Sequence, residues 1–285
     1  MLNPSVVALP VTRLKDHSLS IENDLLAVEE PLEIRLGYGN SNHRQQKSIS
    51  VTMRTPGNDF ELALGFLFTE GIVSKREEVK LIRYCTNGTA NDLNENIVRV
   101  ELDEEKEVDI KNADRNFYTT SSCGICGKTS IEAVRITCKT RINKAELKVH
   151  SSLIIDLPQK LVDVQSVFKH TGGLHASALF KSDGTMVMLR EDIGRHNALD
   201  KLIGAALKMD LIPLDEHLLL LSGRASFELI QKAAMAGIRI VAAVGAPSSL
   251  AVSLAKEFDM TLIGFLRNER FNIYTGSERI LFKER

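Results

Sequence analysis

Apolar positions alternate with polar ones along three short segments in the first half of the chain. These positions are Leu32, Ile34 and Leu36, then Ile49, Val51 and Met53, and finally Val98, Val100 and Leu102. A period of two is typical of a strand with one buried face, so we predict a half-buried strand at each place. Asn58 and Asp59 precede the apolar segment from Phe60 to Phe68, which predicts a helix ended by Gly71. The first half therefore predicts a small α+β portion.

The second half predicts a regular alternation of buried strands and helices. The predicted strands are 217–221, 238–244 and 262–266, and the predicted helices are 197–208, 226–236 and 247–258. This order implies right-handed crossovers between parallel strands, in a sheet that helices cover on both faces. We therefore expect an α/β fold with two portions, an N-terminal α+β portion over 1–145 and an α/β portion over 146–285.

Two more elements are predicted before the parallel strands. Segments 174–180 and 186–190 flank Ser182-Asp183-Gly184, which indicates a hairpin. Pro158 is predicted to start a helix, because proline fits the first helical turn, and Gly172-Gly173 is predicted to end that helix. The expected apolar face of the helix consists of Leu161, Val164 and Phe168.

Composition excludes several classes of function. With 285 residues and 44% hydrophobic content, the chain can bury a substantial core. Its 36 basic and 37 acidic residues argue against non-specific binding of nucleic acid. No segment approaches the roughly 18 uninterrupted apolar residues of a membrane span, and residues 1–20 lack the apolar region of a secretory signal. Four unevenly spaced cysteines form no disulfide framework, so we expect the reducing cytoplasm.

The segment Ser121–Ser130 is the most distinctive in the chain. It places Cys123 and Cys126 two residues apart among glycines, with Lys128 beside them. A neighbouring cation and a following helix N-terminus both stabilise thiolate, the form that attacks sulfur or binds metal. The segment therefore predicts a loop that handles sulfur.

Four interpretations of the two cysteines stay open on the residues alone. They are small packed residues, half of a closed zinc site, a thioredoxin-like dithiol, or a carrier of sulfur as persulfide. The remaining cysteines, Cys85 and Cys138, stand alone, which disfavours a four-ligand zinc site. Ser122 occupies the position where a phosphate-binding loop ending in Gly127-Lys128-Thr129 needs glycine, which disfavours an ATPase.

Ionisable and small residues gather at predicted strand ends in the second half. The segments are His170–His175, Glu191–Asn197, Ser222–Arg224 and Gly245–Ser249. Ligands of open α/β sheets bind at such strand ends, and helix N-termini accept phosphate. Arg195 and Arg224 can each pair with phosphate through two hydrogen bonds. These segments therefore predict an anionic, nucleotide-like ligand.

Taken together, these segments resemble the formate dehydrogenase accessory sulfurtransferase family of FdhD-type proteins. The similar segments, in chain order, are Cys123–Gly127, Thr171–His175, Glu191–Asn197, Ser222–Arg224 and Phe271–Gly276. The similarity extends from Pro31 to Ile280.

The resemblance implies a function and partners. It implies a cytoplasmic, homodimeric sulfurtransferase with a cytidine-deaminase-like fold. Such a protein takes sulfur from a cysteine desulfurase and transfers it to the molybdenum cofactor, molybdenum bis(molybdopterin guanine dinucleotide), for formate dehydrogenase. By the same resemblance, Cys123 is the persulfide-bearing cysteine and Cys126 the second loop cysteine. No resident metal is implied, and GDP or GMP is expected to bind as a fragment of the cofactor.

The residues expected to contact the cofactor come from the C-terminal half. They are His175, Arg195, Arg224, Phe265, Leu266, Arg267, Asn268, Glu269, Arg270, Asn272 and Tyr274. The aromatic ring of Tyr274 is suited to stacking on guanine.

Two alternatives belong to other classes. A zinc-dependent deaminase needs His-x-Glu and Pro-Cys-x-x-Cys, but no histidine here has Glu two residues on, and Ser122 precedes Cys123. A non-enzymatic chaperone would bind and deliver the cofactor without chemistry. Only sulfur transfer requires Cys123.

Overall fold

The structure is a computed structural model that describes residues 4–86, 93–106, 147–267 and 269–282. Its strands in the N-terminal part are β1 (Val6–Lys15), β2 (Ser18–Ala27), β3 (Glu30–Tyr38), β4 (Gln45–Arg54), β5 (Val79–Thr86) and β6 (Leu93–Leu102). The later strands are β7 (Val149–His150), β8 (His175–Lys181), β9 (Met186–Asp192), β10 (His217–Leu221), β11 (Ile240–Ala243), β12 (Thr261–Arg267), β13 (Arg270–Thr275) and β14 (Ile280–Leu281). The helices are α1 (Asp59–Thr69), α4 (Ser151–Val164), α5 (Ser166–Thr171), α6 (Arg195–Lys208), α7 (Phe227–Met235) and α8 (Ser249–Glu257).

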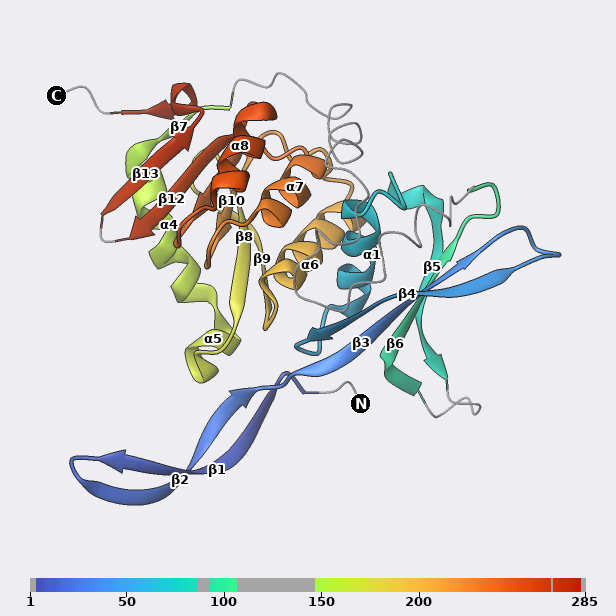
Figure 1. The fold of residues 1–285 in the computed structure, drawn as a ribbon, viewed down its shortest axis with the longest axis horizontal. Coiled ribbons are helices and arrows are strands. Elements are labelled where there is room, and N and C mark those ends of the chain that lie inside the picture. Colours follow the sequence, from blue (N-terminus) through green and yellow to red (C-terminus); the bar gives the residue numbers. More distant parts are fainter. Residues whose placement is uncertain (1–3, 87–92, 107–146, 268, 283–285) are drawn as a thin grey trace.

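A six-stranded mixed sheet forms the centre of the C-terminal half (Figure 1). Its strand order is β13-β12-β11-β10-β8-β9, and β10, β11 and β12 are parallel. The predicted parallel strands and the predicted hairpin, β8 with β9, are confirmed. The α/β fold class predicted from the sequence is therefore confirmed.

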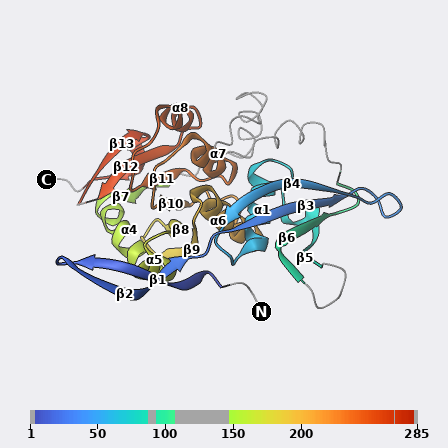
Figure 2. The same cartoon turned by 60° about the horizontal axis from the view of Figure 1, so that its bottom comes forward.

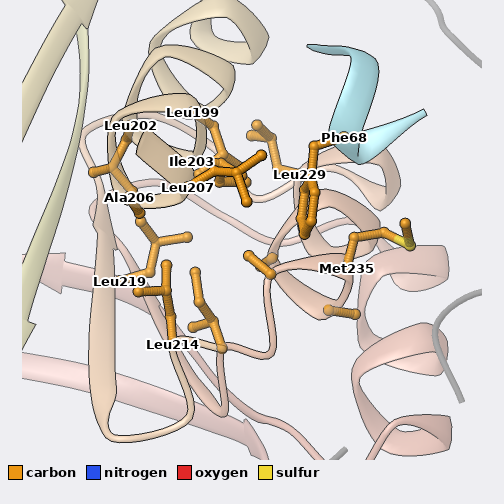
Figure 3. Packing of buried hydrophobic residues seen from close by; sticks show 14 of the residues in the cluster. Phe68, Leu199, Leu202, Ile203, Ala206, Leu207, Leu214, Leu219, Leu229 and Met235 are labelled. Carbon is orange, nitrogen blue, oxygen red and sulfur yellow. The ribbon is translucent and has the colours of Figure 1, made fainter. Parts of the chain in front are cut away.

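Helices cover both faces of this sheet, as predicted. The larger core joins one face to helices α6, α7 and α8, and Figure 3 shows part of it. In that view Leu199 and Ile203 of α6 pack beside Leu229 of α7 and Phe68 of α1. The opposite face packs on α4 in a second core.

The second sheet has the order β4-β3-β6-β5 and packs on α1. The three predicted strands are present, but the predicted burial of β4 is wrong in part. Val51 and Met53 are 57% and 47% exposed, because a β-bulge between Ile34 and Arg35 shifts the pairing so that Ile49 has no partner. A one-residue shift moves the side chains that follow to the other face.

The helix predicted to start at Pro158 begins seven residues earlier, at Ser151, and Pro158 lies inside it. Ile154, Leu157 and Leu161 recur at helical spacing and are buried, which favours the longer helix. The chain leaves helical geometry at Gln165 and starts the short helix α5 at Ser166. Val164, predicted to be on the buried face, is 53% exposed.

Residues 6–27, for which the sequence predicts no element, form a hairpin of β1 and β2 that extends from the body (Figures 1 and 2). We call this hairpin the arm. Within the described residues no helix is both long and apolar enough to cross a membrane.

Candidate functional site

The ends of several strands meet at one edge of the six-stranded sheet. β10, β11 and β12 are parallel, so their C-terminal ends share this edge. β8 is antiparallel to β10 and starts there, and β9 ends there, because His175 pairs with Asp192. The N-termini of α6, α7 and α8 follow β9, β10 and β11 at the same edge. Three helix N-termini therefore point their free N–H groups toward one region, which favours an anion.

The loops after β10 and β11 are tied together by backbone hydrogen bonds. The N–H of Gly245 donates to the carbonyl of Gly223 at 2.9 Å, and the N–H of Ala225 donates to the carbonyl of Ala246 at 3.2 Å. A Cβ on Gly245 would lie 2.9 Å from both the Arg224 nitrogen and the Gly223 oxygen, closer than side chains tolerate. Only glycine fits there, so the two loops can approach each other at backbone distance.

Three basic side chains converge on this edge. Burial lowers the pKa of His175, the positive charges of Arg195 and Arg224 lower it further, and the charge of Asp192 opposes them. Arg224 is exposed, whereas Arg195 is half-buried and its Nε donates to no protein atom among the described residues. At neutral pH the imidazole is therefore neutral and the two arginines supply the positive charge.

His196 is held by groups at the start of α7. Its Nε2 lies 3.3 Å from the Ser226 hydroxyl and 4.0 Å from a Glu228 carboxylate oxygen. Burial lowers the pKa of His196 to about 4, with smaller contributions from the charges of Lys232 and Arg195. His196 therefore stays neutral at physiological pH and offers a hydrogen bond rather than a charge.

Asp192 fixes the position of this segment rather than facing a ligand. Its buried carboxylate accepts from Lys201 Nζ at 2.7 Å, the Gly194 N–H at 2.8 Å and the Asn197 amide at 3.1 Å. It also accepts from the N–H of Thr55, and this hydrogen bond joins the end of β9 to the segment after β4. Burial raises the pKa of Asp192, and the Lys201 ammonium opposes that effect.

An aromatic platform lies at the β12 side of the edge. A Cβ on Gly264 would lie 2.7 Å from Pro247 Cδ and 3.1 Å from Tyr274 Cε2, so both rings rest on bare backbone. Tyr274 is 37% exposed, which leaves part of its ring open to stacking. The guanidinium of Arg267 lies 5.9 Å from the ring centroid of Phe265.

The remaining predicted contact residues occupy varied positions. Glu269 lies in the turn before β13, and Arg270 and Asn272 lie on β13, all three exposed. Leu266 is 1% exposed and packs in the core beneath α4, so its side chain contributes to the core instead of the site. Asn268 lies outside the described residues, as do Cys123 and Cys126.

The sequence placed His196 in a candidate segment but not among the expected contact residues, and it did not single out Ser226; the structure puts the two side chains 3.3 Å apart. His196 directly follows Arg195 at a predicted helix start, which was the available signal. Over the described ranges no group of three or more His, Cys, Asp or Glu residues is arranged to hold a metal ion.

Comparison with known proteins identifies the family. The model of the FdhD/NarQ family matches residues 27–281. The chain belongs to the FdhD/NarQ family. The Sulfur carrier protein FdhD of Streptomyces coelicolor is 48% identical over 275 residues, which cover 96% of this chain and 95% of that protein. The Sulfur carrier protein FdhD of Mycolicibacterium paratuberculosis is 51% identical over 274 residues, covering 95% and 97%.

A solved structure supports the fold of this FdhD/NarQ member. The crystal structure described as a candidate formate dehydrogenase accessory protein from Desulfotalea psychrophila matches with a TM-score of 0.73. The match covers 98% of this chain and all of that one, at 23% identity, and so concerns the fold alone. The expected likeness to cytidine deaminases stays a prediction.

Proposed function

We propose that this protein is a cytoplasmic, homodimeric sulfur carrier that loads Cys123 with persulfide sulfur from a cysteine desulfurase. It supplies that sulfur to molybdenum bis(molybdopterin guanine dinucleotide) for formate dehydrogenase. Membership of the FdhD/NarQ family and relatives named sulfur carrier proteins support the sulfur chemistry. The spacing of Cys123 and Cys126 beside Lys128 supports the same role.

One observation carries the cofactor assignment, namely that Arg195, Arg224 and His175 share an edge with three helix N-termini. The two guanine dinucleotide halves of the cofactor carry pyrophosphate groups. Helix N-termini and arginines are the protein groups that pyrophosphate prefers. GDP and GMP carry the same phosphate chemistry and are the simplest probes of this site.

Persulfide loading transfers one sulfur atom from the donor cysteine to Cys123. The Cys123 thiolate attacks the terminal sulfur of the donor persulfide, the donor's S–S bond breaks, and the donor leaves as thiolate. One S–S bond forms and one breaks, so no net oxidation or reduction occurs. The product is a persulfide on Cys123.

Release of the sulfur needs Cys126 as a second thiol. Its thiolate attacks the Cys123 sulfur of the persulfide, HS⁻ leaves, and a Cys123–Cys126 disulfide forms. The sulfane sulfur gains two electrons, which the two cysteines lose as they become a disulfide. A cellular dithiol reductant then restores both thiols.

A chaperone that only delivers the cofactor is the second candidate, because the basic edge with Arg195 and Arg224 fits such a protein equally well. The two differ in their need for Cys123. Complementation of a strain that lacks its own family member, scored by formate dehydrogenase activity, separates them. A sulfur carrier loses activation in Cys123→Ser, whereas a delivery chaperone with Cys123→Ser activates the enzyme normally.

A further inference from the structure

The first turn of α6 carries two groups of the basic edge, Arg195 and His196. Arg195 is the first residue of the helix and is half-buried, and its Nε donates to no protein atom among the described residues. Ordering a long side chain and its loop during binding costs affinity, so an arginine binds an anion best when its backbone is already fixed. The contacts that fix the start of α6 therefore bear on how well the edge binds a ligand.

Asn197 connects this turn to the N-terminal sheet. Its Nδ2 donates to the carbonyl of Met53 at 2.7 Å, and its Oδ1 accepts from the Thr52 hydroxyl at 3.2 Å. Thr52 and Met53 lie near the C-terminal end of β4, more than 140 positions earlier in the sequence. One side-chain amide thus attaches the first turn of α6 to β4 through both its nitrogen and its oxygen.

The same amide closes the turn that precedes α6. Its Nδ2 also donates to Asp192 Oδ1 at 3.1 Å, and that oxygen accepts the N–H of Gly194 at 2.8 Å. A Cβ on Gly194 would lie 3.0 Å from Asn197 Nδ2 and 3.3 Å from its Cγ, so the amide rests on bare backbone. Gly194 is the N-cap of α6 and has no side chain to fix the helix start. The Asn197 amide fixes it instead.

Asn197 itself is not placed to contact a ligand. Its side chain is directed back onto the protein, and the residue is only 8% exposed. The amide nitrogen carries two hydrogens, and the Met53 carbonyl and the Asp192 carboxylate accept them. Asn197 can therefore affect binding only through the residues that it holds in place.

A buried lysine secures α6 one turn further along. Lys201 is 1% exposed, and its Nζ lies 2.7 Å from Asp192 Oδ2 and donates to the carbonyl of Thr55 at 2.8 Å. These contacts do not involve the Asn197 amide, so they remain when that amide is removed. Loss of the amide should therefore loosen the first turn of α6 without detaching the helix from the rest of the protein.

From these contacts we infer that Asn197 is a positioning residue of the basic edge, which sets Arg195 for the anion by fixing the first turn of α6 against β4. The inference rests on the proposed function, in which the anion is a pyrophosphate group of the cofactor. It adds to that function the residue that holds the arginine, and it makes the end of β4 part of the support of the site.

A double-mutant cycle on the affinity for GDP tests the inference. Calorimetry compares the wild type, Asn197→Ala, Arg195→Ala and the variant with both substitutions. We expect Asn197→Ala to weaken GDP binding by about tenfold, and Arg195→Ala by about ten- to a hundredfold. Because Asn197 acts through Arg195, the effect of Asn197→Ala should fall below about twofold when Arg195 is already alanine.

The N-terminal sheet offers a matched control, and Thr52 offers a milder variant. Tyr84→Phe removes one hydrogen bond of a half-buried side chain, from the Tyr84 hydroxyl to Asp59 at 3.2 Å, and should leave GDP binding unchanged. Thr52→Val removes only the hydroxyl that donates to Asn197 and keeps the shape of the side chain, so it tests the contact even if Asn197→Ala does not fold. We expect Thr52→Val to weaken GDP binding by about threefold.

The NMR titration of His196 provides a readout that needs no ligand. Burial lowers the pKa of His196 to about 4 in the wild type, so this pKa reports whether the first turn of α6 stays in place. We expect it to rise toward its ordinary value of 6.5 in Asn197→Ala, because the loosened imidazole is more accessible to water. A residue that contributes only stability would leave this pKa unchanged.

The results that overturn the inference differ from those that overturn the proposed cofactor site. Losses that add in the double variant, or an Asn197→Ala protein that binds GDP like the wild type, remove the positioning role and leave the site intact. An unchanged pKa of His196 in Asn197→Ala shows that the first turn does not depend on the amide, and it also removes that role. A wild type that does not bind GDP removes the site, and the positioning role with it.

Discussion

Gly65 of α1 and Gly204 of α6 bring the two helices into backbone contact. A Cβ on Gly65 would overlap the Asp200 carbonyl oxygen, and a Cβ on Gly204 would overlap the Glu61 carbonyl oxygen. This contact joins the helix of the N-terminal sheet to a helix of the C-terminal sheet, so one core spans both halves.

We predict that Gly204→Ala lowers the free energy of unfolding by at least about 2 kcal/mol, because the methyl group forces the helices apart. Urea denaturation measures the loss. Gly173→Ala is the matched control, because the nearest atom to its added Cβ would be 3.8 Å away. Equal stability of the two variants would show that α1 and α6 are not in backbone contact.

His196 gives a pH dependence with a defined sign. Its pKa falls from an ordinary 6.5 to about 4 in the folded chain, chiefly through burial. The unfolded chain therefore takes up a proton first, so stability is complete above about pH 6.5 and declines toward pH 4, by up to about 3 kcal/mol. We predict that His196→Gln removes this part of the decline. Urea denaturation at several pH values measures the free energy of unfolding of wild type and His196→Gln. If this free energy depends on pH in the same way in both proteins, the prediction is wrong.

GDP binding tests the basic edge. Arg224→Ala should weaken GDP by about ten- to a hundredfold, the scale of a charged hydrogen bond of about 1.5–3 kcal/mol. Tyr274→Ala should also weaken it, through lost stacking. Arg83→Ala, on the second sheet, is the control and should bind normally. Calorimetry measures the binding of GDP. If wild type does not bind GDP, or if all variants bind it equally, the cofactor binds elsewhere.

Cys126 is predicted to act in release rather than loading. Cys126→Ser should still gain persulfide on Cys123. Release of sulfide when the molybdenum cofactor is added should be slow in this variant, because no second thiolate displaces HS⁻. A sulfide-specific probe follows release over time, with Cys85→Ser as a variant expected to behave like wild type. Release by Cys126→Ser at the wild-type rate would show that the electrons come from another group.

Local patterns predicted much of the fold, and contacts distant in the sequence explain the failures. Ser182-Asp183-Gly184 turns β8 into β9 as expected, because hairpin chemistry is local. The bulge that exposes Val51 depends on pairing with β3, which an alternating pattern cannot reveal. Pro158 is favoured at a helix start, yet the packing of Ile154 and Leu157 extends α4 upstream of it.

In the candidate site, too, local patterns predicted some placements, and contacts between distant residues decided the others. Arg195 and Arg224 follow strand ends, so their placement at one edge could be predicted from sheet topology. The hydrogen bond from Thr55, which follows β4, to Asp192 joins residues 137 positions apart in the sequence, so only the structure reveals it. Leu266 stood in a predicted contact segment, but the register shift between Gly264 and Arg267 turns its side chain into the core beneath α4, which a regular alternating pattern does not predict.

The central claim is that Cys123 carries sulfur. The most direct measurement is peptide-level mass spectrometry after incubation with a cysteine desulfurase and cysteine, on wild type, Cys123→Ser and Cys85→Ser. We predict one added sulfur atom on the Cys123 peptide of wild type and Cys85→Ser, and none on any peptide of Cys123→Ser. Sulfur found on Cys123→Ser at the wild-type level, or an unlabelled Cys123 peptide in wild type, would contradict the claim.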